Sequence, residues 1–215
     1  MLSIQKKSLV DMVYDKLRES IIQLQLPLGS KLNVNELRDR MGVSCTPIRE
    51  AINRLQQEGL VVYENNVGAH IISLAPHDVI EIQQLGMTLH CAAIRLAMAY
   101  GDRNVIIEQL QKQLEDYKNA ETEHDEVVAF KEFLGAYYHN CGNRRLDRHM
   151  LAIQGQQLLL RYIYASCIPQ RTADIEILQQ MLLDTMNGDA DAVCATLQTY
   201  SDQMTRVVET AVTEL

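Results

Sequence analysis

The segment from Asn33 to Gly59 constrains the fold of this chain most, because it contains two short amphipathic patterns separated by a tight turn. In the first pattern, Val34, Leu37 and Met41 recur at helical spacing and form one apolar stripe. Asn33 stands just before this stripe, where its side-chain oxygen can cap the free N–H groups of a helix. The pattern predicts a short helix that ends at a turn over residues 41–43.

The second pattern begins near Ser44 or Thr46, either of which can cap a helix, and Gly59 provides a stop. Its predicted buried face consists of Ile48, Ala51, Ile52 and Leu55. Its opposite face carries donors of the kind that read base edges and hold phosphates, namely Arg49, Asn53 and Arg54. Two helices joined in this way are typical of a helix-turn-helix, whose second helix enters the major groove of DNA. The alternative is a plain packing unit whose arginines are merely solvated.

Two strand-like apolar runs, residues 59–63 and 69–72, follow the second helix directly. The loop between them contains Asn66 and Gly68, so the segment is typical of a β-hairpin. A hairpin at this position is expected to act as a wing that touches the DNA backbone or minor groove.

Residues 8–26 show a further apolar stripe at helical spacing, and Pro27 and Gly29 are expected to end that helix. Residues 1–75 are therefore predicted to form a winged helix-turn-helix domain.

Residues 14–72 resemble the N-terminal domain of GntR-family transcriptional regulators. The resemblance rests on LRESIIQLQLPLGSKL, NELRDRMGVS and TPIREAINRLQQEGLV, and on the hairpin with its glycine. It implies that the start of the second helix, its first arginine and the hairpin tip contact DNA. Carried over to this chain, with two positions of the preceding helix, the implied DNA-binding residues are Asn35, Arg38, Ser44, Cys45, Thr46, Pro47, Arg49, Asn53, Asn66 and Gly68.

Arg49 is the expected base reader among these residues, because a guanidinium can bond both acceptors of guanine at once. Ser44 and Thr46, with the free N–H groups at their helix end, suit phosphate. Cys45 departs from the family, which usually has arginine between the serine and the threonine. A thiol is a weak donor and does not replace a guanidinium, so either the operator differs at that base or the affinity is lower.

Charge is distributed unevenly along the chain, whose net charge is −8. Residues 1–72 hold 9 Lys/Arg and 8 Asp/Glu, which gives +1, and residues 73–215 hold 11 and 20, which gives −9. This balance argues against indiscriminate binding of polyanions. We expect specific DNA binding with a clear salt dependence.

The remaining composition favours a cytoplasmic protein. The 5 cysteines form no CxxC pair, so a reducing compartment is the default. No apolar run approaches the roughly 18 residues of a membrane helix, and no signal segment opens the chain, so no membrane partner is expected.

From Pro76 onward the pattern is helical only, with predicted helices over residues 77–100, 104–120, 125–140, 145–165, 174–186 and 189–212. Such a series favours an antiparallel helical bundle over residues 76–215, which makes the whole chain mainly α. This part resembles the FCD effector and dimerisation domain of the FadR subgroup, with anchors at Gly142-Asn143 and at GDADAV, residues 188–193. The resemblance implies a homodimer and a small-molecule effector.

Many FCD relatives hold a divalent metal through one aspartate and three histidines. Counted back from the anchors, these positions fall on Phe130, Leu134, Leu178 and Tyr200. Phenylalanine and leucine cannot coordinate a cation, and a phenol is a poor ligand alone. We therefore expect no metal and no other cofactor, unless the ligands are misaligned.

The same positions define a candidate effector pocket, which His90 and Asn143 are expected to complete. Side chains of this size usually fill a core, and an apolar-ligand pocket is the alternative. Tyr200 keeps a hydroxyl that would need a partner if it were buried. His90 and Gly86 fall where relatives carry glutamate and arginine, so the polar clamp for a small carboxylate is expected to be lost.

No catalytic constellation is visible, so the chain is not expected to be an enzyme. The sequence predicts a regulator, with repression the commoner mode in the family, that binds a pseudo-palindromic operator as a dimer. Two alternatives stay open. One is a helical small-molecule-binding protein or enzyme that does not act on DNA, and the other is a metal-dependent regulator.

Overall fold

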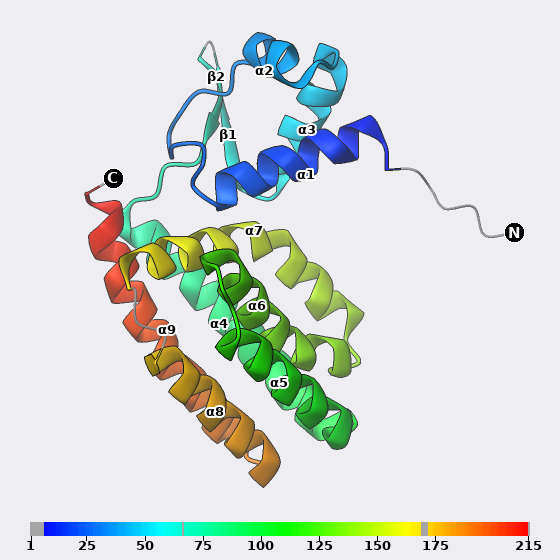
Figure 1. Ribbon diagram of the computed structural model, residues 1–215, viewed down its shortest axis with the longest axis vertical. Coiled ribbons are helices and arrows are strands. Elements are labelled where there is room, and N and C mark those ends of the chain that lie inside the picture. The colour runs from blue at the N-terminus through cyan, green and yellow to red at the C-terminus, as the bar shows by residue number, and fades with distance from the viewer. Residues whose placement is uncertain (1–6, 66, 169–171, 215) are drawn as a thin grey trace, which may run out of the picture. The chain divides into compact units, whose positions relative to one another are not determined.

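A computed structural model describes residues 7–65, 67–168 and 172–214 of the chain (Figure 1). The chain divides after Leu74 into two compact units, called unit 1 (up to Leu74) and unit 2 (from Ala75). Helices dominate both units, and the only strands in the described part form a small hairpin in unit 1. The predicted mainly α fold class, with a winged helix-turn-helix ahead of a helical bundle, is confirmed.

Unit 1 contains α1 (Leu9–Ile22), α2 (Val34–Met41), α3 (Cys45–Gln57), β1 (Val61–Glu64) and β2 (Gly68–Ile71). Helix α1 begins at the predicted place, because Ser8 and Asp11 form a reciprocal capping box. It ends at Ile22, earlier than predicted. Leu24 adopts a φ of 56°, and the N–H groups of residues 25 and 26 both donate to the Ser20 carbonyl, so the chain turns before it reaches Pro27.

The helix-turn-helix follows the sequence pattern closely. Asn33 caps α2 through its side chain, and Gly42 leaves the helix with a φ of 65°, which costs a glycine little. Ile48 and Leu55 of α3 are fully buried, and α3 packs against α1. This packing fixes the orientation of α3 and leaves its opposite side at the surface.

The hairpin pairs β1 with β2 in antiparallel register, from Val61 opposite Ile71 to Glu64 opposite Gly68. Val61, Ala69 and Ile71 are buried, while Val62 and Tyr63 are exposed. The hairpin therefore has one face on the core of unit 1 and one face toward solvent.

Unit 2 contains α4 (Pro76–Tyr100), α5 (Arg103–Lys118), α6 (Glu123–Asn140), α7 (Arg144–Cys167), α8 (Thr172–Asn187) and α9 (Ala190–Val212). Each predicted bundle helix is present, and side chains cap most of the starts: Asp102, Thr122, Asn143 and Asp189 accept bonds from the first turns of α5, α6, α7 and α9. The predicted break at Pro169 lies outside the described residues.

Helix α4 lies in the middle of the bundle and packs against α6, α7 and α9 (Figure 1). Helix α8 packs against α5 and α9 instead. The cavity described below is lined from α4, α6, α7 and α9, so this arrangement separates it from α8. None of the described helices combines the length and the apolar character needed to cross a membrane.

Candidate DNA interface and bundle pocket

The exposed side of α3 presents the side chains predicted to meet DNA. Thr46, Arg49 and Asn53 are exposed, and Arg49 and Asn53 lie four residues apart on one helical face. Ser44 occupies the N-cap position, but its side chain makes no capping hydrogen bond, so the hydroxyl is available to a phosphate. Pro47 is a correction: it is buried, because the first turn of α3 packs it into the core, and its side chain cannot contact DNA.

The arginines of the helix-turn-helix differ in what they bind within the protein. Arg49 makes no hydrogen bond or ion pair with any described residue, whereas Arg38 pairs with its neighbour Asp39 at 2.8 Å. Arg54 pairs with Asp11 of α1 at 2.7 Å and lies over the ring of Tyr14. Arg54 therefore links α3 to α1, and Arg49 is the cation of α3 that is unpaired within the described part of unit 1.

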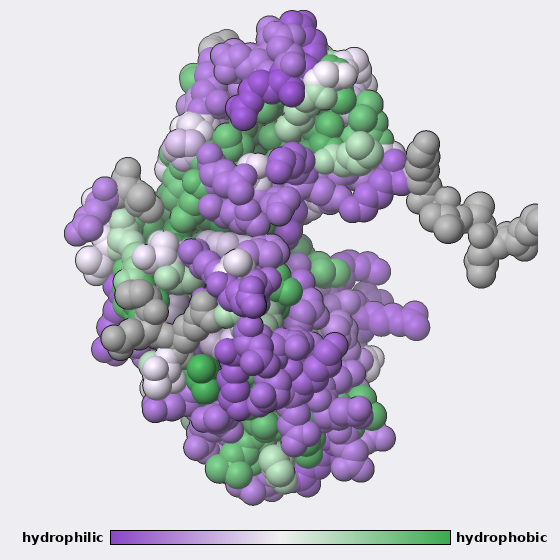
Figure 2. Space-filling view, viewed as in Figure 1, coloured by the Kyte–Doolittle hydropathy of each residue, from purple (hydrophilic) through white to green (hydrophobic). Residues whose placement is uncertain are grey.

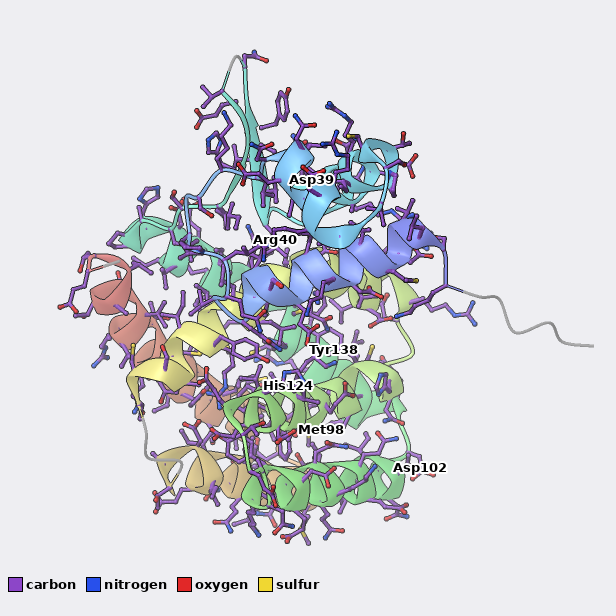
Figure 3. The ribbon with its side chains drawn as sticks, turned by 45° about the horizontal axis from the view of Figure 1, so that its top comes forward. Asp39, Arg40, Met98, Asp102, His124 and Tyr138 are labelled. Atoms are coloured by element: carbon purple, nitrogen blue, oxygen red, sulfur yellow. The ribbon has the colours of Figure 1, made fainter. Side chains whose placement is uncertain are left out.

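The outer face of α2 is hydrophilic, as Figure 2 shows over the part of unit 1 where α2 lies. Asn35 and Arg38 are exposed there. Arg40, labelled with Asp39 in Figure 3, extends from the same helix and was not singled out from the sequence. Because Arg38 has its own carboxylate partner, Arg40 adds a second cation for phosphate on this helix.

The wing gains a cation that lies outside its loop. Gly68 has a φ of 110°, and a Cβ at this position would lie 3.7 Å from Cε of Lys31. The backbone of Lys31 also pairs with the backbone of His70 in β2, in a single antiparallel β-bridge. Its ammonium group therefore stands beside a loop that carries no Lys or Arg of its own. Asn66, predicted to contact DNA, lies outside the described residues, and Cys45 is half-buried at the start of α3.

A cavity of about 290 Å³ lies inside unit 2. Four of the predicted pocket residues line it, namely His90, Phe130, Leu134 and Tyr200. Phe130, Leu134 and Tyr200 are buried in the core of unit 2 and also border this cavity. Leu178 and Asn143 are corrections: Leu178 is fully buried on α8, which contributes no residue to the cavity lining, and the exposed Asn143 caps α7.

His90 lies on α4 with Nδ1 3.1 Å from the hydroxyl of Tyr138, which is labelled in Figure 3 and comes from α6. Burial lowers the pKa of His90 to about 4, so the imidazole is neutral near pH 7. Gly86, one turn earlier, leaves space for an amide: a Cβ there would collide with Gln157, whose Nε2 donates to the Ile82 carbonyl at 2.7 Å. Neutral groups therefore occupy the two positions at which the resemblance implied an arginine and a glutamate.

The polar centre of the bundle is a buried ion pair that sequence reasoning missed. Nη2 of Arg161, on α7, lies 2.7 Å from Oδ2 of Asp174 on α8, and the two residues are 4% and 6% exposed. Tyr117 donates to the same carboxylate oxygen at 2.8 Å and accepts from Arg161 at 2.9 Å. Tyr164 donates to Oδ1 at 3.4 Å. Burial raises the pKa of both tyrosines, so they remain phenols and act as donors.

Aromatic rings surround the guanidinium of Arg161. Its Cζ lies 4.2 Å from the ring centre of Phe130, 5.3 Å from that of Tyr164 and 5.4 Å from that of Tyr200. Such contacts favour a cation that has lost its water. Arg161, Phe130 and Tyr200 all line the cavity, so a positive charge lies at its wall.

Arg161 was visible in the sequence as one charged residue within the apolar run LLLRYIY, residues 158–164. A charged side chain in such a run is rarely buried without a partner. The signal that could have found it was therefore local, but the partner Asp174 lies on the next helix and could not be assigned from spacing.

The four positions that the sequence resemblance implied as metal ligands hold no carboxylate or imidazole in this chain. Phe130, Leu134 and Leu178 have no atom that could coordinate a cation. Among the described residues, no group of three or more His, Cys, Asp or Glu side chains is arranged to hold a metal ion.

The first part of the chain is similar in sequence to a known protein family. Residues 9–71 match the family model for bacterial regulatory proteins of the gntR family. The match covers all elements of the winged helix-turn-helix, from α1 to β2.

Two curated relatives of the chain are named as transcriptional regulators. The chain is 31% identical over 144 residues to the uncharacterized HTH-type transcriptional regulator YdhC of Bacillus subtilis, which covers 64% of each chain. The chain thus spans just under two thirds of the length of this relative. It is 27% identical over 190 residues to the Nta operon transcriptional regulator of Aminobacter aminovorans, covering 87% of this chain and 90% of the relative.

Solved structures of similar fold extend over both units. A putative transcriptional regulator GntR from Rhodococcus sp. RHA1 superposes with a TM-score of 0.75 at 21% identity, covering 94% of this chain and 98% of that one. McbR/YncC of E. coli gives a TM-score of 0.74 at the same identity and coverage. At this identity the likeness shows the fold alone. The two relatives and the Rhodococcus structure carry the name of transcriptional regulator.

Proposed function

We propose that this chain is a cytoplasmic, ligand-responsive transcription regulator that binds a short pseudo-palindromic operator as a homodimer. Unit 1 binds the DNA, and unit 2 binds a small molecule that changes the affinity for the operator. We propose that the protein acts as a repressor, which releases DNA when the ligand binds.

The observation that carries this proposal is the surface of α3. Arg49 is exposed and unpaired within the described residues, Thr46 and Asn53 flank it, and the apolar side of the same helix is fully buried. A helix held in this way can enter the major groove without any change in the core of unit 1. Base reading by Arg49 requires no internal bond to be broken.

The dimer follows from the geometry of DNA. Helix-turn-helix proteins read two half-sites about 34 Å apart, and two copies of one recognition helix do this when a two-fold axis relates them. A dimer also doubles the number of phosphate contacts, which a single unit with a net charge of +1 needs for useful affinity.

The effector role is proposed for the cavity of unit 2, in a bundle that we assign to the FCD domain of the FadR subgroup. A ligand shifts the operator affinity only by the difference between its affinities for two arrangements of the dimer. The cavity is lined from four helices, so a ligand there can favour one packing of these helices over another. We assign no metal to this site, because the expected ligand positions carry no donors apart from Tyr200.

The experiment that tests this function is fluorescence anisotropy with the duplex upstream of the chain's own gene. We expect saturable binding that a scrambled duplex does not reproduce and that weakens steeply as salt rises from 50 to about 200 mM. Binding that is insensitive to both sequence and salt would favour the alternative, a helical small-molecule-binding protein or enzyme.

A second measurement addresses the metal-dependent alternative. Elemental analysis of protein purified without chelator should give far less than one metal ion per chain. Near-stoichiometric zinc, nickel or manganese would show that the ligands were misaligned.

A further inference from the structure

The walls of the unit 2 cavity contain polar atoms that the protein itself does not satisfy. Among the described residues, the buried side-chain atoms without a hydrogen-bond partner are Nε and Nη1 of Arg161 and the hydroxyl oxygen of Tyr200. Arg161 is 4% exposed and Tyr200 is 2% exposed, and both residues line the same cavity. Unsatisfied donors therefore gather at one place.

The ion pair between Arg161 and Asp174 does not satisfy these atoms. Only Nη2 of Arg161 is used by Asp174 and Tyr117, while Asp174 receives donors from three side chains, Arg161, Tyr117 and Tyr164. The carboxylate is therefore well satisfied and the guanidinium is not. A buried N–H group without an acceptor is costly, and the cost is larger for a charged group. An acceptor inside the cavity would remove it.

The charges around the cavity limit the kind of acceptor. Its lining includes the carboxylates of Glu132 and Asp147, of which Glu132 is paired with Lys131 at 2.7 Å. A ligand with one negative charge can compensate the open side of Arg161. A second negative charge would face these carboxylates, and a cation would be repelled by Arg161.

The remaining lining indicates the body of the ligand. Met87, Leu134, Met150, Leu197 and Met204 surround much of the space. Methionine side chains adapt to irregular apolar shapes. A cavity of about 290 Å³ is at the lower end of the size range of small-molecule sites.

We propose that this cavity binds a small organic monoanion, whose acidic head accepts hydrogen bonds from Arg161 and Tyr200 and whose apolar body lies against Leu134, Met150 and Met204. The inference deepens the proposed function by giving the chemical class of the effector, and it rests on that function only for the effect on DNA. The shared head-group chemistry is an anionic oxygen acceptor, which a carboxylate or a phosphorus oxyacid could supply.

The direct test is isothermal titration of the full-length chain with two matched series of probes. One series is benzoate, phenylphosphonate, benzamide and benzylamine, and the other is hexanoate, hexanamide and hexylamine. We expect at least one carboxylate to bind about tenfold or more tightly than its amide, and the amines not to bind. Preference for phenylphosphonate over benzoate would assign the head group to a phosphorus oxyacid. Binding of no anion above its neutral counterpart would overturn the proposal.

Tyr200→Phe provides a variant that should fold. The substitution removes a hydroxyl without a protein partner, so thermal stability should be unchanged or higher, while the affinity for the anion should fall about tenfold. Tyr164→Phe is the matched control, because it removes a buried tyrosine hydroxyl that bonds Asp174 and does not line the cavity. It should lower stability and leave the affinity unchanged. Equal affinities of wild type and Tyr200→Phe would contradict the proposed role of the hydroxyl.

Failure of this inference can be told apart from failure of the proposed function. If the anion binds, Tyr200→Phe weakens it and operator affinity does not respond, the site stands and the regulatory role fails. If operator binding is specific and no anion binds, the DNA-binding function stands and the ligand class is wrong.

Discussion

Unit 1 and unit 2 carry their charged functional groups in opposite ways. In unit 1, Arg49 is held by an apolar helix face but extends into solvent without a partner among the described residues. In unit 2, Arg161 lies inside the bundle, stacked among aromatic rings and paired with Asp174. An exposed arginine costs the fold little and is free to meet a large polyanion. A buried arginine must be compensated, so its surroundings are more specific.

Stability and function therefore depend on the same residues in unit 2 but on different residues in unit 1. Removing Arg49 should change binding and leave the fold intact, whereas a change at Arg161 or its partner should affect both. The following experiments test that contrast, beginning with the largest expected effect.

Asp174→Ala should destabilise unit 2 by about 3–5 kcal/mol, because it leaves the guanidinium of Arg161 buried without its carboxylate. Urea unfolding followed by circular dichroism measures the loss. Asp191→Ala is the matched control, since the pair that Asp191 makes with Arg95 is exposed, and it should give no measurable change. A small effect of Asp174→Ala would show that the ion pair is not a structural centre of the bundle.

Acid should destabilise unit 2 before unit 1. The folded pKa of His90, about 4, is below its unfolded value of about 6.5, so the unfolded state binds the proton first. Stability is therefore lost as the pH falls from about 6.5 to 4, by up to roughly 3 kcal/mol for this group. In unit 1, hydrogen bonds from Ser8 and Arg54 lower the pKa of Asp11 to about 2, so its contribution is lost only below about pH 4.

Urea unfolding of wild type and His90→Gln at several pH values between 7 and 4 tests this prediction. The variant should lose less stability over that interval, because it has no imidazole to protonate. Parallel pH profiles of the two proteins would exclude His90 as the cause.

Arg49→Ala should weaken operator binding by about 1–3 kcal/mol and relax specificity at one base position. Its unfolding curve should match that of wild type, since Arg49 makes no internal bond with the described residues. Anisotropy titrations with singly substituted operators give both quantities. Arg206→Ala, at an exposed position of α9, serves as the control. An unchanged base preference would argue against Arg49 as the base reader.

Substitutions at the two N-cap residues of unit 1, Asn33 and Ser44, should have smaller effects, one mainly on stability and the other mainly on DNA binding. Asn33 bonds the N–H groups of Asn35 and Glu36, so Asn33→Ala should cost about 1 kcal/mol of stability. Ser44 makes no such bond, so Ser44→Ala should change stability by less than about 0.5 kcal/mol. Ser44→Ala should nonetheless weaken DNA binding, through the loss of a phosphate contact. Equal losses of stability in the two variants would show that Ser44 acts as a cap.

Local patterns predicted unit 1 well. The cap at Asn33, the turn at Gly42 and the buried face of α3 depend on residues close together in the sequence, so spacing alone placed them. Pro47 was misjudged because membership of the motif was taken for exposure. Leu24 was placed in α1, although its positive φ ends the helix earlier, and no residue type signals that conformation.

The pocket of unit 2 was predicted only in part, because it depends on contacts between distant helices. Counting from the anchors of the resemblance predicted Phe130 and Tyr200 as pocket residues, and the sequence also indicated that a buried Tyr200 hydroxyl would need a partner. The cavity itself depends on how four helices pack, which helical periodicity does not determine. Arg161 was missed because its partner is on α8, across residues that no local pattern connects.

The most direct measurement is selection of bound duplexes from a random pool by the full-length chain, followed by sequencing. The account predicts enrichment of a pseudo-palindrome whose half-sites lie about one helical turn, or a multiple of it, apart. It also predicts that Arg49→Ala loses the preference at one symmetric position of that sequence. Recovery of no enriched sequence by the wild-type chain would contradict the assignment of α3 as a DNA-reading helix.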